Sequence, residues 1–240
     1  MKRVDVRFLG RVAYGAALAL QAEAADRCAK TGEETLLLLE HDPVFTLGRN
    51  ASRADILFTP ARCAELGIAV FEANRGGKVT YHGPGQLVGY PILDLSPDRR
   101  DVKRYVHDLE ESLIRVLARY GIAGARSALP ERVTSVWVGN DKIAAIGVHL
   151  SRWITTHGFA LNVTTDLTHF LGIVPCGITD GGVTSIERVT GARPSVEEVA
   201  EAYVPEFLAV FERAAAAPGK QRAGDRSPAL RASGDGPVTE

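Results

Sequence analysis

Cys176 is the residue of this sequence whose local setting best suits a catalytic nucleophile. It lies in a Pro-Cys-Gly segment, where Pro175 restricts the backbone before the thiol and Gly177 leaves space beside the sulfur. Such a segment is typical of a loop, and loops carry a large share of catalytic residues. A free cysteine is nevertheless more often a small buried apolar residue. The residue pattern therefore leaves both interpretations of Cys176 open.

The other two cysteines fit the buried interpretation. Cys28 falls on the apolar face of a predicted helix, and Cys63 lies in a short predicted helix without surrounding glycines. The three thiols are far apart and form no CxxC pair, so the sequence indicates neither a zinc knuckle nor a disulfide framework. Reduced thiols are typical of the cytosol, and we predict a cytoplasmic protein.

A thiol nucleophile needs a partner that lowers its pKa, which is about 8.5 in free cysteine. Lys142 opens the apolar run KIAAIG, a setting that could desolvate its ammonium group and lower its own pKa. A lysine at a hairpin turn is more often simply solvated. A histidine such as His82 is the other candidate helper. The pattern does not choose between Lys142 and His82.

Residues 75–90 read RGGKVTYHGPGQLVGY, which is either a surface turn or a backbone shaped to lie against a ligand. A phosphate-binding Walker loop is excluded, because Val79 follows Lys78 and Glu72 takes the place of the first glycine. None of the six histidines belongs to an HExxH motif. The sequence therefore predicts no metal and no cofactor.

The composition is that of a globular protein with a full core. Of the 240 residues, 45% are hydrophobic and 24% are charged. The net charge of −1 gives no field of one sign, so we expect no nucleic-acid partner. No run approaches the roughly 18 apolar residues of a membrane span, and we expect no membrane partner. The first 25 residues resemble a signal peptide, but Asp5, Tyr14 and Gly15 interrupt that pattern and favour a helix of the mature protein.

Strand-like and helix-like segments mix along the chain without strict alternation. We predict strands over 4–12, 36–40, 68–74, 86–95 and 153–163, a hairpin over 135–150, and helices over about 17–31, 60–66, 101–120 and 195–215. Pro91 predicts an edge or bulged position for its strand, and residues 41–50 are predicted to form a loop. This mixture indicates an α+β single domain with mixed, mostly antiparallel sheets packed with helices. We place the domain at 1–213 and a disordered tail at 214–240.

Six motifs together resemble the lipoate-biosynthesis octanoyltransferases, whose core is similar to that of the biotin and lipoate protein ligases. The resemblance covers about residues 4–212, and the tail lies outside it. The motifs are YGAALALQ (14–21), EHDPVFTLGR (40–49), RGGKVTYHGPGQLVGYPILDL (75–95), KIAAIGV (142–148), THGFALNV (156–163) and PCGITDGGVTSI (175–186).

This resemblance implies transfer of an octanoyl group from acyl carrier protein to a lysine of a lipoyl-accepting domain. The acceptors would be 2-oxoacid dehydrogenase subunits and the glycine-cleavage carrier protein, and we expect a monomer. By the same resemblance Cys176 carries the acyl group as a thioester, and Lys142 lowers the pKa of its thiol. The implied substrate-binding residues are Arg75, Gly76, Gly77, Lys78, Val79, Thr80, Tyr81, His82, Ala145, Ile146, Gly147, Gly158, Phe159 and Ala160.

Two points stay open at the level of sequence. Lys142 is either neutral, and accepts the thiol proton, or charged, and stabilises the thiolate. The competing functions are an acyl-thioester hydrolase that uses the same nucleophile, a non-catalytic binding module, and an ATP-dependent lipoate ligase of the same superfamily.

Overall fold

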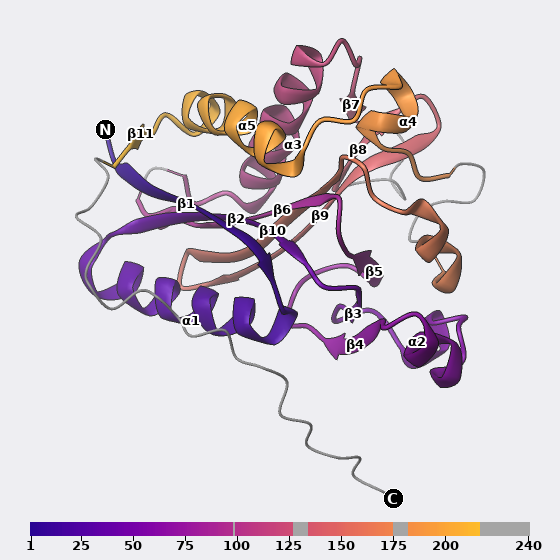
Figure 1. Ribbon diagram of the computed structural model, residues 1–240. Helices are drawn as coiled ribbons and strands as arrows, with labels where there is room; N and C mark the ends of the chain where they lie inside the picture. The colour runs from indigo at the N-terminus through magenta and orange to yellow at the C-terminus, as the bar shows by residue number, and fades with distance from the viewer. Residues whose placement is uncertain (98, 127–133, 175–181, 217–240) are drawn as a thin grey trace, which may run out of the picture.

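The computed structural model describes residues 1–97, 99–126, 134–174 and 182–216. Within these residues an eight-stranded sheet and a three-stranded sheet pack with helices on both faces of the larger sheet (Figure 1). The predicted α+β fold class is therefore confirmed.

The larger sheet has the strand order β11-β1-β2-β6-β10-β9-β8-β7. Its strands are β1 (Arg3–Val12), β2 (Glu34–His41), β6 (Gln86–Ile92), β7 (Ala125–Arg126), β8 (Ser135–Val138), β9 (Asp141–Ser151), β10 (Ile154–Asn162) and β11 (Ala214–Ala215). β1 pairs in parallel with β2 and β11, whereas the other neighbouring strands are antiparallel. The predicted hairpin over 135–150 is formed by β8 and β9.

The smaller sheet corrects one prediction. It has the order β4-β3-β5, with β3 (Val44–Leu47), β4 (Ala69–Glu72) and β5 (Val79–His82). Residues 41–50 were expected to form a loop, yet Val44–Leu47 is a strand that pairs in parallel with β4 and antiparallel with β5. Those partners lie 25 to 38 residues further along the chain, and a four-residue segment alone carries too little periodicity to reveal them.

Three long helices cover the larger sheet. α1 (Tyr14–Thr31) packs on one face, and α3 (Val102–Arg119) and α5 (Val196–Phe211) pack on the other (Figure 1). The shorter helices are η1 (Arg53–Asp55), α2 (Pro60–Glu65), η3 (Leu167–Gly172) and α4 (Ile186–Thr190). The predicted capping box of α5 is present, because Ser195 and Glu198 each accept a hydrogen bond from the other's backbone N–H. No helix among the described residues is long and apolar enough to cross a membrane.

α5 ends at Phe211, earlier than the predicted 215, because Glu212 adopts a left-handed conformation with φ of 53°. Residues 214–216 are then hydrogen-bonded to β1 and to the residue before it. The predicted boundary at 213 stays a prediction, and the tail from 217 lies outside the described residues.

Pro91 was expected at an edge or a bulge, but β6 lies in the interior of the larger sheet. Pro91 pairs with Leu36 of β2, while the ladder between β6 and β10 ends at Gly89 and Phe159. The N–H that Pro91 lacks would lie just beyond that ladder. Proline therefore removes none of the hydrogen bonds between β6 and β10.

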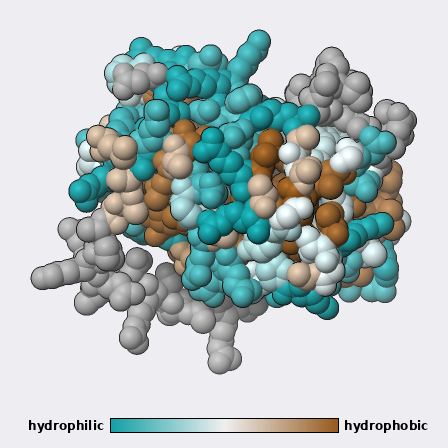
Figure 2. All heavy atoms as spheres, turned by 90° about the horizontal axis from the view of Figure 1, so that it is seen from above, coloured by the Kyte–Doolittle hydropathy of each residue, from teal (hydrophilic) through white to brown (hydrophobic). Residues whose placement is uncertain are grey.

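Hydrophobic side chains fill both interfaces of the larger sheet. The main cluster lies between the sheet and helices α3 and α5, and a second cluster lies beneath α1. A third cluster joins the smaller sheet to α2, with Phe45 and Tyr81 fully buried. Seen from the side of α3 and α5 (Figure 2), the surface is mostly hydrophilic, with hydrophobic residues confined to limited areas.

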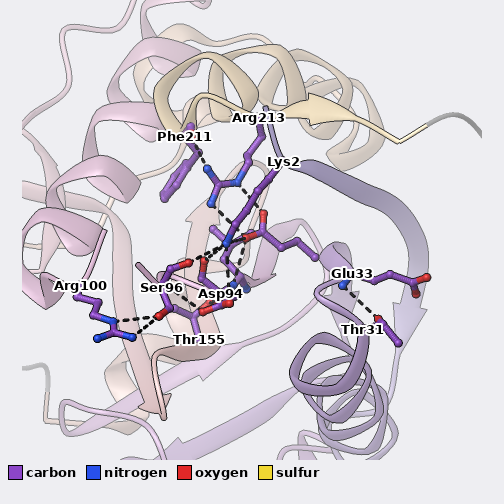
Figure 3. Close-up of polar contacts among 11 residues, drawn as sticks. Lys2, Thr31, Glu33, Asp94, Ser96, Arg100, Thr155, Phe211 and Arg213 are labelled. Atoms are coloured by element: carbon purple, nitrogen blue, oxygen red, sulfur yellow. Dashed lines mark hydrogen bonds and ion pairs between the residues drawn. The ribbon is translucent and has the colours of Figure 1, made fainter. Parts of the chain in front are cut away.

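A buried ion pair connects the start of β2 to the segment that follows α5. Arg213 donates to both carboxylate oxygens of Glu34, at 2.6 and 3.1 Å. Both side chains are almost inaccessible, with exposures of 9% and 0%. Lys2 lies 3.5 Å from the same carboxylate and donates to the carbonyl oxygens of Asp94 and Ser96 (Figure 3). A charged carboxylate buried this deeply would destabilise the fold if these donors did not compensate its charge.

Candidate active site

A cavity of about 360 Å³ lies between the glycine-rich segment and strands β9 and β10. With the exception of Tyr81, every residue that the sequence analysis assigned to substrate binding lines this cavity, and so does Lys142. The lining also includes residues that the sequence analysis did not single out: Tyr14, Gln86, Tyr90, Thr134, Ser135, Ala144, His157, Asn162, Phe170, Ile173 and Val183.

Tyr81 packs away from the cavity. Successive side chains of a strand point to opposite faces, and β5 directs Thr80 and His82 toward the cavity and Tyr81 into the core of the smaller sheet. Its ring contacts Phe45 edge to face, and its hydroxyl lies 2.8 Å from Nδ1 of His169.

The buried Arg75 side chain stabilises the glycine-rich segment by hydrogen bonds. It donates to the carbonyl oxygens of Gly76 and Lys78, and to both the carbonyl and the hydroxyl of Thr46. Gly76 N–H also donates to Val148 O of β9 at 3.0 Å. The segment is therefore a fixed wall of the cavity and not a loose surface turn.

Glycines let the walls approach one another. A Cβ atom at Gly147 would lie 3.0 Å from Cδ of Arg75, and one at Gly158 would lie 2.6 Å from Cδ of Pro91 and clash with the carbonyl of Gly89. Side chains at these positions would push strands apart or fill the cavity, which explains why glycine is required there.

Lys142 is held through its backbone from two sides. Its N–H donates to Gly182 O and its carbonyl accepts from Thr184 N–H, both at 2.9 Å. Its ammonium nitrogen lies 5.1 Å from the centre of the Trp137 ring. The side chain is half-buried at the cavity wall.

Cys176 lies outside the described residues, as does the rest of 175–181. The residues on either side are described: Ile173 and Val183 both line the cavity. Val174 N–H donates to Asp55 O, and Asp141 accepts from Gly182 N–H. Both ends of the segment that carries the thiol are therefore fixed at the cavity.

A chain of amide hydrogen bonds crosses the cavity floor. Nδ1 of His82 lies 2.8 Å from Gln86 Oε1, Gln86 Nε2 donates to Asn162 Oδ1, and Asn162 Nδ2 donates to Thr184 O. Because Gln86 offers an acceptor, His82 donates from Nδ1 and its Nε2 is left as an acceptor. Burial lowers the pKa of His82 well below its usual range, so the ring is neutral at pH 7.

The opposite end of the cavity is lined by aromatic polar side chains. His157 adopts a left-handed backbone conformation with φ of 57° inside β10, held by a 2.7 Å hydrogen bond from its N–H to the buried Gln21. Burial, together with the nearby Arg75, lowers the pKa of His157 to about 4. Tyr90 packs edge to face on this ring. The sequence signal that could have identified His157 as a cavity residue is its position next to a glycine within a predicted strand, as in His157-Gly158.

The sheet register gives the cavity a direction. Asn162 pairs with Gln86 near the Lys142 end, and Gly158 pairs with Gly147 near the His157 end. Four residues of strand separate these pairs, which corresponds to roughly 13 Å. The cavity is therefore long enough for an elongated group that extends between Lys142 and His157.

Comparisons with known proteins agree with this geometry. Residues 13–208 match the lipoyl protein ligase A/B catalytic domain family. The chain is 53% identical over 220 residues to an octanoyltransferase of Myxococcus xanthus, covering 88% of this chain and 60% of that relative. It is 52% identical over 213 residues to an octanoyltransferase of Solibacter usitatus, covering 88% of this chain and 94% of that relative.

A solved structure supports the fold. The chain is similar to a bi-partite lipoate protein ligase from Thermoplasma acidophilum, with a TM-score of 0.71 and 17% identity over 91% of this chain and 89% of that one. At this identity the likeness speaks for the fold alone, and it confirms the predicted single-domain, ligase-like α+β core.

Proposed function

The chain belongs to the octanoyltransferase group of the lipoyl protein ligase A/B catalytic domain family, and we propose that it moves an octanoyl group from octanoyl-acyl carrier protein to a lysine of a lipoyl-accepting domain. Family membership supports an acyltransferase. The donor, the covalent intermediate and the catalytic pair of Cys176 and Lys142 are our proposal.

In the first step the Cys176 thiolate attacks the thioester carbonyl of the donor. The bond between the acyl carbon and the carrier sulfur breaks, and the carrier leaves as a thiolate that takes a proton from Lys142. One thioester replaces another, so the step needs no ATP. The absence of a Walker motif from the sequence is consistent with this route.

In the second step the acceptor lysine attacks the acyl-enzyme. Free lysine has a pKa of about 10.4, so its amine must lose a proton to become a nucleophile at neutral pH. That first proton goes to solvent. The attacking amine loses a second proton as the amide forms, and Lys142, neutral after the first step, accepts it while the bond to the Cys176 sulfur breaks. The thiolate and the charged lysine are restored together, and each cycle releases one proton to solvent.

One observation carries the proposal: Lys142 lies on the wall of an acyl-sized cavity and is paired with the chain that directly follows the PCG segment. Val183 forms a parallel bridge to Lys142, and Ile173 lines the cavity before that segment. Cys176 is three residues from Ile173, a reach of at most about 11 Å. This short reach supports the proposed pairing of Cys176 with Lys142.

The remaining aspects of the proposal follow from the family. We propose lipoyl domains of 2-oxoacid dehydrogenase subunits and the glycine-cleavage carrier protein as acceptors, and a cytoplasmic monomer as the working form. The apolar wall formed by Ala145, Ile146 and Ala160 would bind the hydrocarbon chain.

Intact-mass measurement tests the covalent step. Mixed with octanoyl-acyl carrier protein, the wild type should gain one octanoyl group that hydroxylamine removes, and Cys176→Ala should gain none. Cys63→Ala is the matched control and should acylate like the wild type. An unmodified wild type would refute the mechanism, rapid release of free octanoate without an acceptor would favour a hydrolase, and acylation from free octanoate and ATP would favour a ligase.

A further inference from the structure

We propose that Trp137 is a positioning residue for Lys142: its indole face holds the ammonium group at the cavity wall and keeps it charged in the resting protein. The inference rests on the proposed function, because it concerns the partner of the Cys176 thiol. It chooses between the two states of Lys142 that the sequence leaves open.

The geometry places the lysine cation over an aromatic face. The Lys142 nitrogen lies 5.1 Å from the ring centre of Trp137, within the roughly 6 Å at which a cation is attracted to an aromatic ring. Trp137 is only 2% exposed, so little water competes with the indole on that side. Tryptophan has the most favourable face of the aromatic side chains for such a contact.

An irregularity in the hairpin creates this contact. The register between β8 and β9 shifts between Val136 and Trp137, so that Trp137 pairs with Lys142 while Val136 pairs with Ala144. The extra residue, Ile143, forms a bulge, and bulges next to sites redirect a side chain. The backbone of Lys142 is also fixed by Gly182 and Thr184. Both the cation and the ring are therefore held in place by the fold.

The other charged groups around the cavity act against a charged lysine. Arg75 and Lys78 are cations that also line the cavity, and like charges disfavour a further cation near them. The carboxylate on the same strand, Asp141, accepts a hydrogen bond from Gly182 N–H. The remaining titratable groups of the described cavity walls are His82 of β5, His157 of β10, Tyr14 of α1 and Tyr90 of β6. Of the groups named here, the indole face is the one that favours the charged form of Lys142.

The consequence is a preformed pair of charges. An ammonium group held over Trp137 stabilises the Cys176 thiolate before the donor arrives. Once the thiolate has become a thioester, the ammonium loses that partner and can release its proton to the departing carrier thiolate. The indole therefore sets the starting state of the proton cycle without touching the acyl group.

Alkylation of Cys176 at different pH values, followed by peptide mass spectrometry, tests the inference. Loss of one cation–π contact corresponds to a fall of roughly 0.4 to 1.5 units in the pKa of Lys142, and Trp137→Leu should raise the pH midpoint of Cys176 alkylation measurably, by up to that amount. Trp137→Phe, with a weaker aromatic face, should give an intermediate midpoint. Trp153→Leu is the matched control, because Trp153 contacts Arg100 instead of Lys142 and should leave the midpoint unchanged.

A second measurement leaves the buried indole intact, in case Trp137→Leu does not fold. The sequence has two tryptophans, so in Trp153→Phe the fluorescence reports on Trp137 alone. Its emission should change with pH as Lys142 loses its proton, and this change should disappear in Trp153→Phe/Lys142→Met. An emission titration identical in both proteins would overturn the inference.

The two proposals fail in different ways. A wild type that forms no octanoyl adduct refutes the proposed function, whatever Trp137 does. A wild type that forms the adduct and depends on Lys142, but shows the same alkylation midpoint with Leu, Phe or Trp at position 137, refutes the role of Trp137 alone.

Discussion

Replacing Arg213 by methionine should destabilise the protein strongly, although Arg213 lies far from the candidate site. The substitution keeps an apolar stem of similar length but removes both hydrogen bonds to Glu34, whose side chain is fully buried. What remains is a carboxylate in a low-dielectric environment with a weakened set of donors.

The expected loss is about 3 kcal/mol. Removing one partner of a buried ion pair typically costs roughly 3 to 5 kcal/mol. The lower end applies, because Lys2 still lies 3.5 Å from the Glu34 carboxylate and Asp94 N–H still donates to it at 3.2 Å. For a protein of this size that loss corresponds to a fall in melting temperature of about 6 to 12 °C.

Urea unfolding and thermal melting measure this loss. Arg11→Met is the matched control, because its ion pair with Asp42 is 53% and 56% exposed and should contribute at most about 1 kcal/mol. The double variant Glu34→Gln/Arg213→Met should recover part of the stability, since it no longer buries a charge. If Arg213→Met costs less than about 1 kcal/mol, the claim that Lys2 and Asp94 alone compensate the buried Glu34 charge poorly is wrong.

Three further outcomes test the site. Lys142→Ala should raise the pKa of the Cys176 thiol toward about 8.5 and slow acyl uptake; an unchanged alkylation profile would contradict the pairing. Gly147→Val should block octanoyl uptake more than butanoyl uptake, because its Cβ would already lie 3.0 Å from Arg75; equal loss with both donors, measured by adduct mass, would argue against a lining role. Stability should fall as the pH drops from about 6.5 to 4, because native His157, with its pKa lowered to about 4 by burial, stays neutral while the unfolded chain takes up a proton. His157→Gln should reduce this slope by up to about 1.4 kcal/mol per pH unit in urea titrations at several pH values, and a slope equal to that of the wild type would contradict the assignment.

Local patterns predicted the elements whose information lies within a few turns of chain. The helix predicted over residues 101–120 is α3, and the structure adds that Asp101 caps it by accepting from the N–H groups of Lys103 and Arg104. The Gly-Asn turn between two β-rich runs predicted the β8–β9 hairpin. These features depend on periodicity and turn chemistry, which neighbouring residues determine by themselves.

Long-range pairing was less accessible to such reasoning. Strand β3 was missed because its partners lie elsewhere in the chain, and Pro91 was expected at an edge or a bulge because proline lacks a donor. The interior position is tolerated only because the ladder to β10 stops at Gly89. Whether a proline costs a hydrogen bond depends on which strand lies beside it, and the sequence around it does not contain that information.

The sequence by itself determined which residues could do chemistry: a cysteine between proline and glycine, a lysine that opens an apolar strand, and glycines where backbone must come close. Only the tertiary structure decided their relations. It pairs Lys142 with Val183, which follows the PCG segment, and places its ammonium group over the Trp137 ring. It also places His157 in the lining at the far end of the cavity. The physical reason is that residue type fixes what a group can do, whereas its partners and protonation state depend on burial and distance between segments far apart in the chain.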